Sequence, residues 1–101
     1  MVKILLVCSA GMSTSLMVNK MKEAAAQKGL ETEIWAVADA EAANNVGKAD
    51  ILMLGPQVRF LESKMKGIAG ETPVTVIDMM SYGQMNGKAV LEQALKILGI
   101  E

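Results

Sequence analysis

The sequence contains no histidine and only one cysteine, Cys8. Without an imidazole, the chain cannot carry serine–histidine or cysteine–histidine catalysis, and it cannot form a phosphohistidine of its own. With one thiol and no histidine we expect neither a zinc site nor a transition-metal site, and no intramolecular disulfide can form. A single free thiol is typical of a reducing compartment, so we expect a cytoplasmic protein.

Aromatic residues and unbalanced charge are also scarce. The chain has one Trp, one Tyr and one Phe, and its 10 basic and 11 acidic residues leave a net charge of −1. There is no basic block, so binding to nucleic acid is not expected. The apolar runs, such as residues 4–7 and 51–54, are far too short to span a bilayer. The first residues pass directly from an apolar run into polar ones, so we expect neither a signal peptide nor membrane insertion.

What the sequence does contain is an alternation of short apolar runs with helical patterns. Its 101 residues, 51% of them hydrophobic, suffice for one domain spanning 1–101. We expect strands at 2–7, 31–38, 50–54 and 74–77. We expect helices from residue 16 to about 29, from an N-cap at Asp39 to about 46, and from 56 past 68. A polar stretch at 78–87 precedes the last expected helix, whose inner face is Leu91, Ala94, Leu95 and Leu98.

This alternation predicts an α/β fold with a four-stranded parallel sheet and helices on both faces. Placing the most apolar strands inside gives the strand order 2-1-3-4, with a change of direction between the first and third strands. Ligands of such folds bind at the carboxyl ends of the strands, where the direction changes. Residues 8–15, 55–57 and 78–82 lie there, and we expect the function at this edge.

Cys8 ends the first expected strand, and small or polar residues separate it from the helix that contains Leu16. Consecutive backbone amides in such a turn, with the free amides of the helix start, form an anion site. The same amides favour the thiolate, the nucleophilic form of cysteine. We therefore predict that Cys8 accepts a phosphoryl group, with a buried apolar cysteine as the alternative. The residues predicted to bind the phosphate are Ser9, Ala10, Gly11, Met12, Ser13, Thr14 and Ser15.

One position in this turn argues against a hydrolase. Cysteine phosphatases have an arginine six residues after the nucleophile, where this chain has Thr14, and its only arginine is Arg59. Hydrolysis without that guanidinium would be poorly catalysed, which suits a protein that passes the phosphoryl group on. Asp78 is the nearest candidate general acid, but an aspartate that closes a strand more often has a structural role. Two alternatives stay open: a low-molecular-weight cysteine phosphatase-like hydrolase and a flavodoxin-like FMN-binding module.

Three segments of the sequence resemble those of a known family. They are CSAGMSTS at 8–15, LGPQ at 54–57 and VIDMMSYGQMNG at 76–87. Together they resemble the IIB component of the bacterial sugar phosphotransferase system, of the lactose/cellobiose/diacetylchitobiose type. The resemblance covers essentially the whole chain, and it implies a fold like that of the low-molecular-weight tyrosine phosphatases.

The resemblance also implies a reaction and partners. Cys8 would receive a phosphoryl group from a phosphohistidine of a IIA protein and deliver it to a sugar carried by the membrane IIC permease. The chain would then be a protein-phosphocysteine–sugar phosphotransferase that needs no cofactor and acts on a β-disaccharide of the cellobiose, diacetylchitobiose or lactose class. The resemblance assigns residues 9–15 to phosphate binding and places Gln57 and Tyr82 at the same mouth.

Methionine is unusually frequent, with nine in the chain. One group falls on apolar faces and is predicted to be core: Met17, Met21, Met53 and Met65. A second group falls in segments expected around Cys8: Met12, Met79, Met80 and Met85. Flexible thioethers suit a surface that fits two partners in turn, although they would equally cover the bases of the loops.

Overall fold

A computed structural model of the chain describes residues 1–9 and 12–100, with the backbone alone for residues 12 and 13. Its strands are β1 (Val2–Cys8), β2 (Thr32–Ala38), β3 (Ile51–Leu54) and β4 (Val74–Val76). The strands pair in parallel in the order β2-β1-β3-β4. The predicted fold class and strand order are therefore confirmed.

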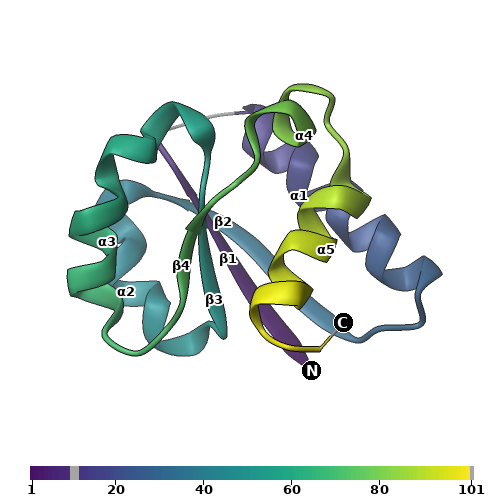
Figure 1. Ribbon diagram of the computed structural model, residues 1–101, viewed down its shortest axis with the longest axis horizontal. Coiled ribbons are helices and arrows are strands. Elements are labelled where there is room, and N and C mark those ends of the chain that lie inside the picture. Colours follow the sequence, from purple (N-terminus) through teal and green to yellow (C-terminus); the bar gives the residue numbers. More distant parts are fainter. Residues whose placement is uncertain (10–11, 101) are drawn as a thin grey trace.

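Helices enclose this sheet on both faces. They are α1 (Met12–Gln27), α2 (Ala42–Asn45), α3 (Glu62–Ala69), α4 (Met79–Gly83) and α5 (Gly87–Ile97). Short 3₁₀ segments lie beside α2 and α3, namely η1 (Asp39–Glu41), η2 (Val46–Lys48) and η3 (Pro56–Leu61). Figure 1 shows α1 and α5 on one face, α2 and α3 on the other, and α4 near the start of α1. None of the helices in the described ranges is long and apolar enough to cross a membrane.

The two faces of the sheet bury two separate cores. Alternation along β1 sends Ile4 and Leu6 into the core with α1 and α5, and Leu5 and Val7 into the core with α2 and α3. The central strands are therefore apolar on both faces, which explains their continuous hydrophobic runs. The methionines predicted to be core are all fully buried: Met17, Met21, Met53 and Met65.

The first helix begins earlier than the sequence indicated. The sequence predicts a turn that continues through Ser15, but α1 already begins at Met12. Hydroxyl residues are poor in the middle of a helix but tolerated in its first turn, because the first amides need no intrahelical partner. The predicted end is confirmed: Gly29 has a φ of 68°, and the amides of Gly29 and Leu30 donate to the carbonyls of Ala26 and Ala25 at 3.0 Å each.

The second predicted helix is broken into short pieces. Asp39 does not cap it: Asp39 is the first residue of η1, whose N-cap, Ala38, makes no side-chain bond. Asn45 uses its side chain instead, accepting a hydrogen bond from Trp35 Nε1 at 3.1 Å and donating to the carbonyl of Glu41 at 2.9 Å. Contacts with β2, rather than a local capping signal, therefore shape this connection.

Candidate functional site

The carboxyl ends of three strands meet at one edge of the sheet. The amide of Gly55, just after β3, donates to the carbonyl of Val7 in β1 at 3.0 Å. The amide of Ile77, just after β4, donates to the carbonyl of Leu54 at 2.8 Å. These bonds bring the segments that follow the strands together at the predicted edge, beside Cys8.

Cys8 is the last residue of β1 and pairs in register with Ala38 of β2. Its thiol is free, and the residue is only 4% exposed. Burial of this kind would also suit a structural cysteine, so the position of Cys8, and not its exposed fraction, is what favours a functional thiol. It ends the strand at which the direction of the strand connections reverses, between β1 and β3, and it directly precedes the segment that leads into α1.

The residues predicted to bind phosphate divide into three groups. Ser9 and Ser15 are exposed, whereas Thr14 is 2% exposed. The backbones of Met12 and Ser13 lie in the first turn of α1. Ala10 and Gly11 lie outside the described residues, as do the side chains of Met12 and Ser13.

Three of the predicted site residues meet at the hydroxyl of Tyr82. Thr14 Oγ1 lies 3.1 Å from Tyr82 Oη, with either hydroxyl able to donate, and Gln57 Nε2 donates to Tyr82 Oη at 3.5 Å. Thr14 belongs to α1, Gln57 to η3 and Tyr82 to α4, so the hydroxyl links three segments distant in sequence. Gly55 makes room for this arrangement, because a Cβ at that position would lie 2.7 Å from Gln57 Oε1.

The helix that carries Tyr82 lies in a stretch that the sequence indicated only as polar. Asp78 is its N-cap: Asp78 Oδ2 accepts hydrogen bonds from the amide and the hydroxyl of Ser81, each at 2.9 Å. These two bonds lower the pKa of Asp78 from its ordinary value of 3.8, the backbone bond contributing most. Asp78 is thus an ionised capping residue, which agrees with the structural role suggested by the sequence.

The cap of α4 should depend on pH. Because the pKa of Asp78 is lower in the folded chain than in the unfolded chain, its stabilising effect is complete above 3.8 and is lost as the pH falls through the folded pKa. The amide resonance of Ser81 in NMR spectra should shift with a midpoint below 3.8. Ser81→Ala, which keeps only the backbone bond, should show a higher midpoint than the wild type. A wild-type midpoint at or above 3.8 would contradict the cap.

Exposed apolar side chains lie in the segments that follow β3 and β4. Phe60 in η3 is 76% exposed, and Met79 and Met80 in α4 are 61% and 70% exposed. Met85 instead packs partly buried against the core of α1 and α5. The sequence prediction omitted Phe60, although a signal existed: Phe60 lies off the apolar helical spacing that Val58 begins.

The comparison with protein-family models shows the family of the chain. The family model for the lactose/cellobiose-specific IIB subunit of the phosphotransferase system (PTS) matches residues 3–93. The chain belongs to this IIB family. It is therefore a component of a sugar phosphotransferase system, and membership favours phosphoryl transfer over hydrolysis or flavin binding.

Individual relatives agree with the family model. The chain is 51% identical over 100 residues to the oligo-beta-mannoside-specific EIIB component of Bacillus subtilis (strain 168), covering 97% of each chain. It is 45% identical over 103 residues to the galactose-specific EIIB component of Lactococcus lactis subsp. cremoris (strain MG1363), covering 94% of each. The solution structure of the cellobiose-specific IIB component from Borrelia burgdorferi matches with a TM-score of 0.80 and 35% identity, over 97% of this chain and 92% of that one. These IIB relatives carry different sugar names.

Proposed function

We propose that this IIB protein is a phosphoryl carrier whose acceptor is Cys8. The single observation that carries the proposal is the position of the only thiol at the end of β1, directly before α1. The Cys8 thiolate attacks the phosphorus of a phosphohistidine on a IIA partner, so that a P–S bond forms and the P–N bond breaks. A sugar hydroxyl oxygen then attacks the phosphorus, the P–S bond breaks, the hydroxyl proton is released and the thiolate is restored.

The start of α1 would hold the phosphoryl group between these two steps. The first amides of a helix lack intrahelical acceptors, and the helix dipole places positive potential there. Of residues 9–15, which we assign to phosphate binding, Met12, Ser13 and Thr14 supply amides of the first turn of α1, and Ser9 and Ser15 supply exposed hydroxyls. Because the Thr14 hydroxyl is already bonded to Tyr82, we assign to Thr14 an amide rather than a hydroxyl contact with phosphate. Gln57 and Tyr82 complete the mouth of the site.

The same site lacks the group that would promote hydrolysis. Thr14 occupies the position of the phosphatase arginine, and it is buried with its hydroxyl bonded to Tyr82. Arg59, the only arginine, is exposed on η3. A phosphocysteine held by amides, without a guanidinium to stabilise the transition state for water attack, persists long enough to be delivered.

The partner surface we propose consists of Phe60, Met79 and Met80, which are exposed in segments at the carboxyl edge of the sheet. Exposed methionines can adapt their shape, so these side chains can contact the IIA protein and then the cytoplasmic side of the IIC permease. The whole chain, 1–101, would act as one cytoplasmic IIB domain. Its sugar would be a β-disaccharide of the cellobiose, diacetylchitobiose or lactose class, chosen mainly by IIC.

The test is reconstitution with the general phosphotransferase proteins, a IIA protein and phosphoenolpyruvate. Intact-mass spectrometry should show the addition of one phosphoryl group, and fragmentation should place it on Cys8. Membrane vesicles that contain the IIC partner should remove it only when the correct sugar is added. No phosphoryl uptake, or rapid Cys8-dependent hydrolysis of p-nitrophenyl phosphate, would overturn the proposal.

A further inference from the structure

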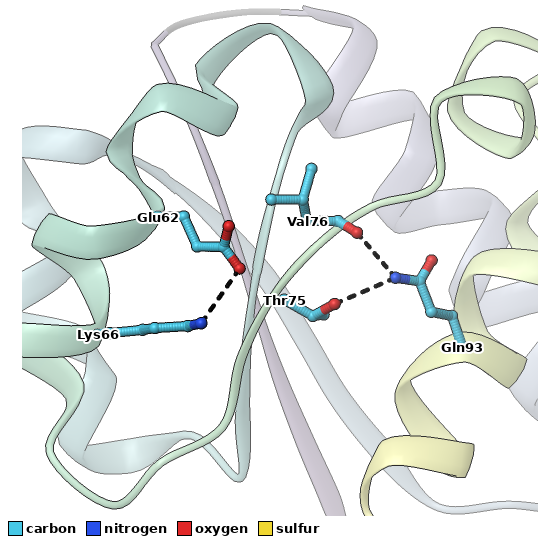
Figure 2. A network of polar contacts seen from close by, with 5 residues as sticks. All are labelled: Glu62, Lys66, Thr75, Val76 and Gln93. Atoms are coloured by element: carbon cyan, nitrogen blue, oxygen red, sulfur yellow. Dashed lines mark hydrogen bonds and ion pairs between the residues drawn. The ribbon is translucent and has the colours of Figure 1, made fainter.

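Gln93, in the middle of α5, bridges to the last strand and to the residue that caps α4. Its Nε2 donates to the carbonyl of Val76 at 2.8 Å and to Thr75 Oγ1 at 3.3 Å, as Figure 2 shows. Its Oε1 accepts from the amide of Asp78 at 3.0 Å. We call these contacts the Gln93 bridge. The ion pair between Glu62 and Lys66 in the same figure lies within α3 and is not part of the bridge.

The bridge takes the place of a missing neighbouring strand. The residues that flank β4 bond to β3 through the carbonyl of Pro73 and the amide of Ile77, so the backbone groups of the alternate residues face the open edge of the sheet. Val76 and Asp78 are alternate residues, and one carboxamide supplies the donor for the first and the acceptor for the second. The side chain of Gln93 therefore supplies the hydrogen bonds that a peptide group of a neighbouring strand would make to this edge. It also holds the backbone of Asp78 in place.

From Asp78 the contacts continue to the site. The carbonyl of Asp78 accepts the amide of Tyr82 at 2.9 Å, while its carboxylate caps α4 at Ser81. Tyr82 Oη then contacts Thr14 in the first turn of α1. A series of contacts thus runs from α5, through the start of α4, to the first turn of α1.

We propose that Gln93 is a positioning residue for phosphoryl transfer, which places the Tyr82 hydroxyl against Thr14. The expected effect of Gln93 on the rate of phosphoryl transfer rests on the proposed function. Its effect on the position of the Tyr82 hydroxyl does not. Gln93 does not touch the phosphoryl group; its effect passes through Asp78 and Tyr82. No sequence pattern indicated this role, because a glutamine on an amphipathic helix is typical of a solvent-facing position.

The structural half is tested without any phosphoryl transfer. Tyr82 is the only tyrosine, so labelling with 3-fluorotyrosine gives a single ¹⁹F resonance that reports on its surroundings. Gln93→Met keeps the length of the side chain and removes its hydrogen bonds, and it should move or broaden this resonance and speed exchange of the Asp78 amide. The matched control Gln27→Met, at the exposed end of α1, should change neither. Unchanged signals in Gln93→Met would overturn the proposal.

The kinetic half is a double-mutant cycle with Tyr82→Phe. Gln93→Met should lower the rate of phosphoryl transfer at saturating donor by about tenfold, because small errors in placement are costly at a reacting centre. In the Tyr82→Phe background the same change should cost less than about twofold, since the path through the hydroxyl is already cut. Equal losses in both backgrounds would show that Gln93 acts through general stability and would overturn the proposal.

The two proposals fail in distinguishable ways. If the wild type accepts no phosphoryl group while the ¹⁹F signal responds to Gln93→Met, the proposed function fails and the bridge to Tyr82 stands. If the wild type is phosphorylated on Cys8 but the cycle is additive, the function stands and the positioning role fails. Should Gln93→Met unfold, Gln93→Lys keeps a donor for the carbonyl of Val76 but loses the acceptor for the Asp78 amide, and it replaces Gln93→Met in both experiments.

Discussion

Replacement of Cys8 by serine is expected to abolish phosphoryl transfer. An alcohol is almost fully protonated at neutral pH, so serine offers a far weaker nucleophile than a thiol, and no P–S bond can form. The chain has no histidine and no second cysteine to take over the reaction. We expect uptake from the phosphorylated IIA protein to fall to less than about a thousandth of the wild-type rate.

The fold should survive this substitution, which makes the result interpretable. Serine is slightly smaller than cysteine, and burying its hydroxyl at a site that is 4% exposed should cost about 1–3 kcal/mol if it finds no partner. The control is Ser63→Ala, at an exposed position of α3 outside the proposed site, which should keep most of the activity. Urea unfolding gives the stability, and mass spectrometry gives the phosphorylation. Stoichiometric, wild-type-rate phosphorylation of the Cys8→Ser chain would show that the acceptor lies elsewhere.

Substitution of Gly87 by alanine is expected to produce the largest loss of stability from a single methyl group. Gly87 is buried at the start of α5, where this helix crosses α1. An added Cβ would overlap the backbone carbon of Lys20 and would lie 2.6 Å from the carbonyl oxygen of Lys20. Backbone atoms inside a helix cannot turn away, so α1 and α5 would have to separate.

The expected cost is about 3 kcal/mol, at the upper end of the range for overpacked positions. In a domain of this size the melting temperature should then fall by more than about 10 °C. Gly67→Ala is the matched control, since its Cβ would meet no atom within 4 Å on the exposed side of α3. That control should stabilise the protein by about 0.5–1 kcal/mol, because alanine is the better helix former. Equal effects at the two glycines would show that the close approach of the helices carries no cost.

Much of the fold could be predicted because it depends on local patterns. The continuous apolar run through Leu5 and Leu6 indicated a strand buried on both faces, and the alternation of strands with helices fixed the class of sheet. Gly29 ended α1 for a reason intrinsic to glycine, which adopts a positive φ without a steric penalty. Cys8 was found in the same way, because a thiol between an apolar strand and a polar turn is visible in the sequence alone.

The predictions that were wrong in the segments after β2 and β4 share a physical cause. The sequence predicted one helix from an N-cap at Asp39 to about residue 46, but Asn45 accepts a hydrogen bond from Trp35 of β2, and the segment forms short 3₁₀ and α-helical pieces. In the polar stretch after β4, the cap at Asp78 and the bond from Gln93 support a helix of only five residues. Such short elements depend on tertiary contacts more than on propensity.

The sequence by itself determined the sheet, its strand order and the single thiol at the end of the first strand, because each follows from hydrophobic period, chain direction or composition. Only the tertiary structure decided which polar groups surround that edge. Thr14 and Tyr82 are 68 residues apart in the chain and share a hydrogen bond, and Gln93 reaches the cap of α4 from 15 residues away. Hydrogen bonds of this kind need an orientation that packing alone supplies, so no periodicity in the sequence encodes them.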